Sequence, residues 1–248
     1  MLFDRVFNNP KWKGQDAFPS CKEWKQEINE RLEFIKRKNE LDRFLPRLNS
    51  TRTQRDEALA EILAAYVLEE KLNYKIIEWE KPTIGGKNVD LLILIGSEEI
   101  YCEVKSPGWE AELNQEERMS GRKSKPKYIN AEARSVAPWQ NIQYSLIKAY
   151  GKFLPNKKNM VILCHDLFVG LLILPDDLNI KISLYSDTPH YNSIIEKDEK
   201  GCFSNNTYEN VGGLLLIEDY LFCKDKEVTY KYKFFPNEYS KNPFYIQT

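Results

Sequence analysis

The chain has 248 residues and a formal net charge of only −1 at pH 7. Its apolar fraction of 42%, with 12% aromatic residues, is enough for a hydrophobic core and excludes a disordered chain. No apolar run reaches the roughly 18 residues of a membrane-spanning helix, and no signal-peptide pattern begins the chain. Five cysteines form no C-x-x-C pair, which argues against zinc and against disulfides. We therefore expect a cytoplasmic protein without a membrane partner.

Residues 1–50 predict a helical extension that packs on a core of residues 51–248. A capping box at 20–23 precedes apolar residues at helical spacing, which predicts a helix to about Lys38. Pro46 is expected to end the segment that begins at Leu41, because proline disrupts a helix interior. The apolar residues of the longer helix are Trp24, Ile28, Leu32 and Ile35.

A second helix is predicted over residues 53–72, followed by a strand from Tyr74 to Trp79. Glu61 is flanked on this helix by small residues, which would let that side approach a sheet closely. Glu57, one turn earlier, lies on the same side, and either acid could instead be an ordinary surface residue. The apolar stripe is Leu59, Ile62, Leu63 and Tyr66, and the small residues are Ala58, Ala64 and Ala65.

Residues 87–105 predict a β-hairpin with a turn at Gly96-Ser97. A two-residue turn places Asp90 opposite Glu103, whereas a four-residue turn would place it opposite Lys105. Either length leaves all three side chains on one face, because side chains alternate with a period of two. Such charges are costly to bury alone, and two facing acids can bracket a small cation such as Mg²⁺ or Mn²⁺. The plain alternative is a half-solvated sheet face carrying a Lys–Glu pair.

The spacing of Asp90, Glu103, Val104 and Lys105 resembles the core of the PD-(D/E)XK nuclease superfamily, which has a restriction-endonuclease-like fold. Residues 61–77 are similar to the first core helix and strand of that fold. Val89 departs from the motif, since proline commonly stands there. The likeness extends over roughly residues 53–175.

The resemblance implies that Asp90 and Glu103 hold Mg²⁺, that the Val104 carbonyl assists, and that Glu61 is a third metal ligand. It also implies that Lys105 orients the attacking water. Gln140-x-x-x-Tyr144, on a helix expected from Pro138 to Phe153, resembles a motif that some of these nucleases carry near the metal. Gln143 is an alternative to Gln140, and a plain polar helix face is the bland interpretation.

Charge is separated sharply along the chain. Between Gly121 and Met160 there are nine Lys or Arg residues and one acid, a local net charge of +8 that leaves −9 for the remainder. This pattern favours binding to a phosphate backbone, although a solvated lysine loop would look the same. A basic loop is expected over 119–135. The candidate nucleic-acid contacts are Arg122, Lys123, Lys125, Lys127, Arg134 and Lys148.

Further strands are expected over 160–165, 169–174, 211–217 and 221–235, giving a strand-rich carboxyl-terminal part. Residues 176–210 show few clear elements and suggest an insertion or a substrate-facing loop. His165 and His190 have no catalytic context, and His165 is best explained as a strand-end residue with ordinary hydrogen bonds.

The predicted fold is α/β, with a central mixed sheet flanked by helices, a restriction-endonuclease-like core and an amino-terminal helical extension. The predicted function is that of a Mg²⁺-dependent nuclease, with Mn²⁺ as a substitute, which hydrolyses phosphodiester bonds as an endonuclease. DNA is favoured over RNA, and a homodimer is consistent with enzymes of this type. Two alternatives stay open: a catalytically silent nucleic-acid-binding module of the same fold, and a structural or interaction protein.

Overall fold

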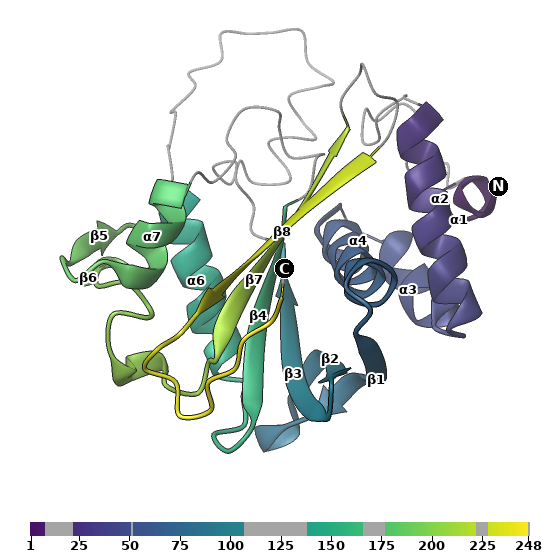
Figure 1. Cartoon of the computed structure of the whole chain (residues 1–248). Coiled ribbons are helices and arrows are strands. Elements are labelled where there is room, and N and C mark those ends of the chain that lie inside the picture. Colours follow the sequence, from purple (N-terminus) through teal and green to yellow (C-terminus); the bar gives the residue numbers. More distant parts are fainter. Residues whose placement is uncertain (8–21, 51, 107–137, 166–176, 222–227, 248) are drawn as a thin grey trace, which may run out of the picture.

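The computed structural model describes residues 1–7, 22–50, 52–106, 138–165, 177–221 and 228–247. Six strands form one mixed sheet in the order β1-β2-β3-β4-β7-β8, and helices cover both of its faces (Figure 1). The predicted α/β class with a central mixed sheet flanked by helices is therefore confirmed. Within these ranges, no helix combines the length and apolar character needed to cross a membrane.

The first three strands form an antiparallel meander: β1 (Lys75–Pro82), β2 (Asn88–Ile95) and β3 (Glu98–Lys105). Ile95 faces Glu98, so the turn between β2 and β3 has two residues and the four-residue alternative is excluded. The turn begins with Gly96 at φ 62°, a conformation that costs glycine little. A short 3₁₀ turn, Ile84–Gly86, lies between β1 and β2.

The second half of the sheet is built by crossovers. β4 (Lys158–His165) and β7 (Gly213–Leu221) run parallel to β3, and β8 (Val228–Pro236) closes the far edge antiparallel to β7. Parallel neighbours need a long connection. Helix α6 (Pro138–Tyr150) lies in the connection between β3 and β4, and α7 (Asp177–Tyr185) lies in the connection between β4 and β7.

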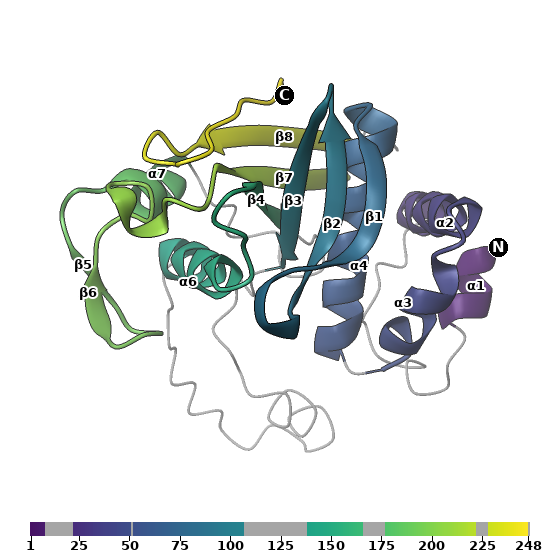
Figure 2. The ribbon, with the colours of Figure 1, turned by 90° about the horizontal axis from the view of Figure 1, so that it is seen from below.

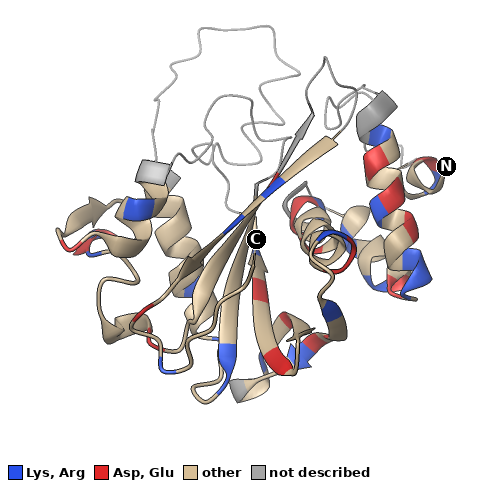
Figure 3. Cartoon of the chain, in the orientation of Figure 1, with Lys and Arg blue, Asp and Glu red and all other residues tan. Residues whose placement is uncertain are grey.

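One face of the sheet is covered by the amino-terminal helices (Figure 2). These are α1 (Leu2–Phe7), α2 (Lys22–Arg37), α3 (Leu41–Leu48) and α4 (Arg52–Tyr66), which continues as a π-helical turn, Val67–Lys71. Their apolar side chains form one buried cluster with the strands, whereas α6 and α7 form a second cluster on the opposite face. Charged residues lie along the helices, near the ends of strands and within β8, whereas most of the sheet is made of other residue types (Figure 3).

Helix α4 lies close to the sheet because its contact side is built from small residues. Ala58, Ala64 and Ala65 have no exposed surface, as the sequence suggested. The carbonyl of Ala60 accepts a hydrogen bond from Cys164 of β4 at 3.3 Å, so helix backbone and strand side chain meet directly.

Two sequence-based predictions are corrected by the structure. Helix α3 does not end at Pro46 but continues to Leu48. Burial of Phe44 and Leu48, both without exposed surface, stabilises the turn that proline weakens. Residues 176–210 are also more regular than expected, since they contain α7 and a small hairpin.

That hairpin pairs β5 (His190–Asn192) with β6 (Lys197–Glu199), and a 3₁₀ turn, Asn206–Tyr208, follows it. The strand expected over 169–174 and the basic loop over 119–135 lie outside the described residues.

Candidate metal and phosphate site

The site is built where β2 and β3 separate. Their antiparallel ladder ends at Leu91 opposite Cys102, although β2 stays paired with β1 beyond this point and β3 stays paired with β4 as far as Lys105. The next residue pair along the hairpin is Asp90 and Glu103. The two acids therefore stand at the fork, where the ladder between β2 and β3 has ended but each strand is still paired with its other neighbour.

The Asp90 side chain takes over a backbone hydrogen bond at this fork. Extending the register past Leu91 would pair the Val104 N–H with the carbonyl of Val89. Instead, Val104 N–H donates to Oδ2 of Asp90 at 2.7 Å. A backbone donor thus fixes the carboxylate of Asp90 against the strand that carries Glu103.

Glu103 lies at the centre of the site and has no exposed surface. Its Oε1 is 2.5 Å from Nζ of Lys105 and 2.5 Å from Nζ of Lys152, which follows α6. Its Oε2 is buried and has no hydrogen-bond partner among the described residues. An unsatisfied buried carboxylate oxygen is costly, so this atom is a ready acceptor for a ligand that is not part of the chain.

Glu61 faces the site from α4 but is held by an arginine. Its two carboxylate oxygens each accept a hydrogen bond from the guanidinium of Arg47 on α3 at 2.6 Å. Glu57, the competing residue of the sequence analysis, is exposed. The structure thus brings Glu61 rather than Glu57 toward the fork, paired with a cation from the helical extension.

The three acids interact electrostatically. Burial, with the negative charges of Glu103 and Glu61, raises the pKa of Asp90 to about 8. Burial and the charge of Glu103 also raise the pKa of Glu61, against the opposing effect of Arg47. Burial alone would lower the pKa of Lys152, yet the neighbouring acids raise it, with Glu103 contributing most. The positive charge of Lys152 opposes this rise in the pKa of Asp90 without cancelling it.

These residues fit a divalent cation held by two carboxylates. Mg²⁺ commonly retains several waters and uses one or two carboxylates, so Asp90 and Glu103 suffice. The unpartnered Oε2 of Glu103 and the raised pKa of Asp90 both indicate a deficit of positive charge at the fork. In the part of the chain that the structure describes, no three acidic, histidine or cysteine side chains meet as a ready ligand set. Glu61 would join only after leaving Arg47.

Gln140 is not brought to the acids. Its amide donates to the carbonyl of Tyr191 at 3.2 Å and accepts from Ser193 at 2.8 Å, so it holds the β5–β6 hairpin. The alternative residue, Gln143, does the same through Lys200 and Asn192. The end of α6 nearest the acids is its carboxyl end, ten residues or about 15 Å from Gln140.

Of the predicted nucleic-acid contacts, Lys148 is exposed on α6, with Nζ 4.2 Å from the ring centre of Tyr144. The other five lie outside the described residues. His190 contacts Ser186 and the ring of Trp139, far along the chain from the acids. The five predicted contacts that lie outside the described residues are Arg122, Lys123, Lys125, Lys127 and Arg134.

Two residues of the site were missed by the sequence analysis. Lys152 was counted only as one cation in a basic stretch, and Arg47 was not singled out. Neither has a local signal, because each meets its acid through tertiary packing. The nearest signal in the sequence for Lys152 is its position just after the helix that connects the β2–β3 hairpin to β4.

No protein-family model matches the chain, and no curated protein matches it. One solved structure with detectable likeness is SfsA of Pyrococcus furiosus, determined in complex with Ca²⁺. The identity is 16%, the TM-score is 0.30, and the alignment covers 72% of this chain and 62% of that chain. The alignment thus spans less than two thirds of SfsA, and a likeness of this size supports no conclusion about activity.

Proposed function

We propose that the protein is a metal-dependent nuclease of the PD-(D/E)XK type, which hydrolyses phosphodiester bonds in nucleic acid. The observation that carries the proposal is the fork between β2 and β3. There a fully buried Glu103 keeps one oxygen without a partner beside Asp90, whose pKa is about 8. A divalent cation satisfies both acids at once. DNA is the favoured substrate and internal cleavage the favoured mode, in a cytoplasmic protein that could act as a homodimer.

Each residue of the fork has a defined part in this proposal. Asp90 and Glu103 would hold Mg²⁺, with the carbonyl of Val104 as a further ligand and the carboxylate of Glu61 joining only after it leaves Arg47. When bound, Mg²⁺ supplies a water of lowered pKa and neutralises charge on the phosphate.

Lys105 and Lys152 contact the same oxygen of Glu103, and each can have a separate role toward the substrate. Lys105 donates a hydrogen bond that orients the attacking water. Lys152 approaches from the end of α6 and can bind a non-bridging oxygen of the phosphate. With the metal bound to the acids, the two ammonium groups would be left to interact with an anionic substrate.

Cleavage of supercoiled plasmid tests the proposal. Wild-type protein with Mg²⁺ or Mn²⁺ is expected to nick the plasmid, and Asp90→Ala and Glu103→Gln are expected to lose the activity. Glu99→Gln is the matched control, because Glu99 lies on the same strand but is exposed and pairs with Lys157. Binding without cleavage by the wild type would indicate the catalytically silent module, and absence of both would leave a structural or interaction protein.

A further inference from the structure

The amino-terminal extension contributes one side chain to the surroundings of the fork. Arg47 lies near the end of α3, and its guanidinium donates to both carboxylate oxygens of Glu61 at 2.6 Å. The helix itself is anchored, because Phe44 and Leu48 are fully buried and the ring of Phe44 packs edge-to-face on Trp79 of β1. Helices α3 and α4 lie side by side (Figures 1 and 2). A change of partner at Arg47 therefore needs only its side chain to move.

The cationic side chains of this cluster are more exposed to solvent than the acids that they contact. The side chain of Glu103 has no exposed surface and that of Glu61 is 16% exposed, whereas that of Arg47 is 28% exposed. Lys105 and Lys152 are exposed to a similar degree, 24% and 30%. An anion that arrives from solvent can therefore contact these cations without displacing the buried acids.

Arg47 also interacts electrostatically with the acids of the fork. The hydrogen bond with Glu61 contributes most to raising the pKa of Arg47 above its ordinary value, burial opposes this rise, and the charge of Asp90 adds to it. Glu61 in turn interacts with the charge of Glu103. The guanidinium thus belongs to the same electrostatic cluster as the two acids that would hold the metal.

A divalent cation at the fork changes the partner that Arg47 requires. Glu61 can become a ligand only after it leaves Arg47, and the metal then offsets its charge. A largely buried guanidinium without an anion is costly. Its planar set of donors, which fits the two oxygens of a carboxylate, also fits two oxygens of a phosphate. A phosphate therefore matches both the charge and the geometry of the partner that Arg47 loses.

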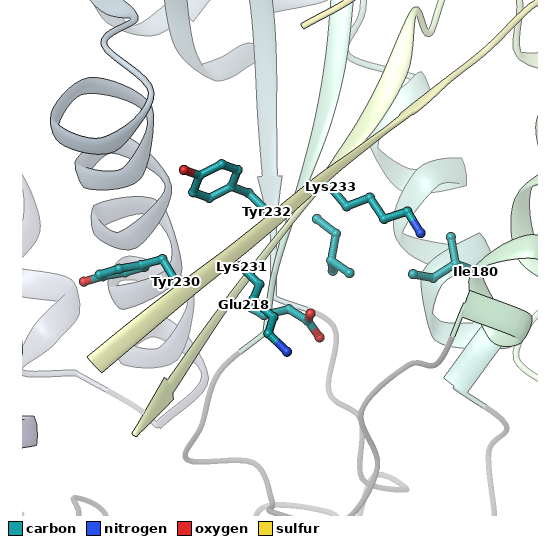
Figure 4. Close-up of a pocket in the computed structure, with 7 residues that line it drawn as sticks. Ile180, Glu218, Tyr230, Lys231, Tyr232 and Lys233 are labelled. Carbon is teal, nitrogen blue, oxygen red and sulfur yellow. The ribbon is translucent and has the colours of Figure 1, made fainter. Parts of the chain in front are cut away.

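A second cluster of charged side chains does not offer such an exchange. It borders a pocket of about 390 Å³ between β7, β8 and α7 and contains Glu218, Lys231 and Lys233 (Figure 4). Each of these side chains has an interaction partner, and the sheet register pairs Lys231 with Glu218. Because Glu218 is not an acid of the fork, a change of partner there would not be coupled to the metal.

We propose that Arg47 exchanges Glu61 for a phosphate of the nucleic acid when Glu61 moves to the metal. This inference rests on the proposed nuclease function and gives the amino-terminal extension a part in it. A phosphate that binds Arg47 releases Glu61 to the metal, and a metal that binds Glu61 releases Arg47 to the phosphate. By thermodynamic linkage, each ligand raises the affinity for the other by the same factor.

Each half of the exchange can be measured without the other ligand, in the full-length protein. In EDTA, the anisotropy of a fluorescein-labelled duplex of roughly 20 base pairs reports binding without cleavage. Glu61→Gln removes the carboxylate that holds Arg47, so this variant should bind the duplex at least about five-fold more tightly than wild type. Glu57→Gln is the matched control, since it removes the same charge from an exposed position one turn earlier on α4 and leaves the pair of Arg47 and Glu61 intact. It should change the affinity by less than about two-fold.

The double variant Arg47→Met/Glu61→Gln identifies the group that gains the phosphate. The tighter duplex binding of Glu61→Gln should disappear in it, because the guanidinium is absent. Circular dichroism checks that each variant is folded. The double variant removes both charges of the pair, so the duplex measurement decides the proposal even if Arg47→Met alone does not fold.

Calorimetric titration with Mn²⁺ alone measures the other half. Arg47→Met leaves Glu61 available as a ligand, so Mn²⁺ should bind at least about five-fold more tightly than to wild type, and the double variant should lose this gain. Arg37→Met, which removes an exposed arginine that pairs with Glu70, is the matched control and should bind Mn²⁺ as wild type does. Arg47→Met should nevertheless nick plasmid more slowly than wild type, because the phosphate loses a contact.

The outcomes separate the exchange from the nuclease proposal. Suppose that wild type nicks plasmid but Glu61→Gln binds the duplex no more tightly than Glu57→Gln, or keeps its gain in the double variant. Arg47 then only holds Glu61 in place, and the nuclease stands without the exchange. A folded Arg47→Met protein with wild-type affinity for Mn²⁺ would have the same meaning. If wild type neither binds Mn²⁺ nor cleaves nucleic acid, the nuclease proposal fails and the exchange fails with it.

Discussion

Asp90 shows how a single residue can be placed for function at a cost to stability. Its carboxylate replaces a backbone acceptor at the point where β2 and β3 separate, and it is desolvated beside two other acids. Burial of a charge without a counter-ion opposes folding. Such a cost is tolerated where a ligand supplies the missing charge.

Asp90→Asn should therefore raise stability in the absence of metal while abolishing cleavage. The Asn carbonyl oxygen can still accept the Val104 N–H, and the buried charge is gone. An unfolded aspartate has a pKa of about 3.9, against about 8 in the folded protein, so the folded state binds more protons between these values. Wild-type stability should consequently fall as pH rises through this window.

The measurement is the melting temperature of both proteins from pH 4 to pH 9 in EDTA. The two should converge near pH 4, and the advantage of Asp90→Asn should be largest above pH 8. Asp198→Asn, at an exposed position on β6, should show no comparable trend. Parallel wild-type and Asp90→Asn curves would show that Asp90 is charged throughout.

Substitution of Lys152 tests whether its contact with Glu103, which it shares with Lys105, serves catalysis. Lys152→Met should reduce kcat by about 10²-fold or more, the scale of losing one group that stabilises transition-state charge. Lys181→Met, at an exposed position on α7, should leave kcat unchanged. A normal kcat with lowered melting temperature would assign Lys152 a purely structural part as a counter-ion of Glu103.

At the scale of elements, α4 and α6 position the site in different ways. Helix α4 presents Glu61 because its alanines allow close contact with the sheet. Helix α6 contributes only through its carboxyl end, where Lys152 reaches Glu103. Its amino-terminal half instead holds the β5–β6 hairpin through Gln140 and Gln143.

The close approach of α4 predicts that Ala64→Leu destabilises the fold by about 1–3 kcal/mol, because added methylenes have no space in a packed core. Urea denaturation measures the change. Glu57→Leu, on an exposed side of the same helix, should fall within about 0.5 kcal/mol of wild type. If Ala64→Leu changes the free energy of unfolding by as little as this, α4 can shift away from the sheet.

The separation between Gln140 and the acids predicts that Gln140→Ala keeps wild-type kcat. The variant should instead loosen the β5–β6 hairpin, since Tyr191 and Ser193 both lose their side-chain partner. Faster amide hydrogen exchange over residues 190–199, with unchanged cleavage, is the expected combination. Loss of cleavage with unchanged exchange would restore Gln140 to the catalytic group.

At the scale of the whole molecule, metal binding at the fork should raise the free energy of unfolding. A ligand that binds only the folded state stabilises it, by about 2.7 kcal/mol at a concentration one hundred times Kd. Mn²⁺ should raise the melting temperature of the wild type and of Glu99→Gln, but not of Glu103→Gln. The effect should grow with pH toward about 8, because the ion must displace the proton of Asp90. An equal rise in Glu103→Gln would place the ion elsewhere.

Much of this arrangement was open to prediction from local pattern. The two-residue turn at Gly96 sets the register of the hairpin, and the period of two then places Asp90 opposite Glu103. The small residues of α4 indicated its close contact with the sheet. The predicted helix end at Pro46 is wrong because burial of Phe44 and Leu48 offsets the free-energy cost of a proline inside the helix.

The sequence by itself determined the α/β class, the β2–β3 hairpin and the acids at its end, because these depend on periodicity and on one short turn. Only the tertiary structure decided that Arg47 holds Glu61 and that Lys152 meets Glu103. The physical reason is the distance along the chain. Parallel strands joined by crossovers receive their register from the packing of whole helices, and that packing leaves no mark within any one segment.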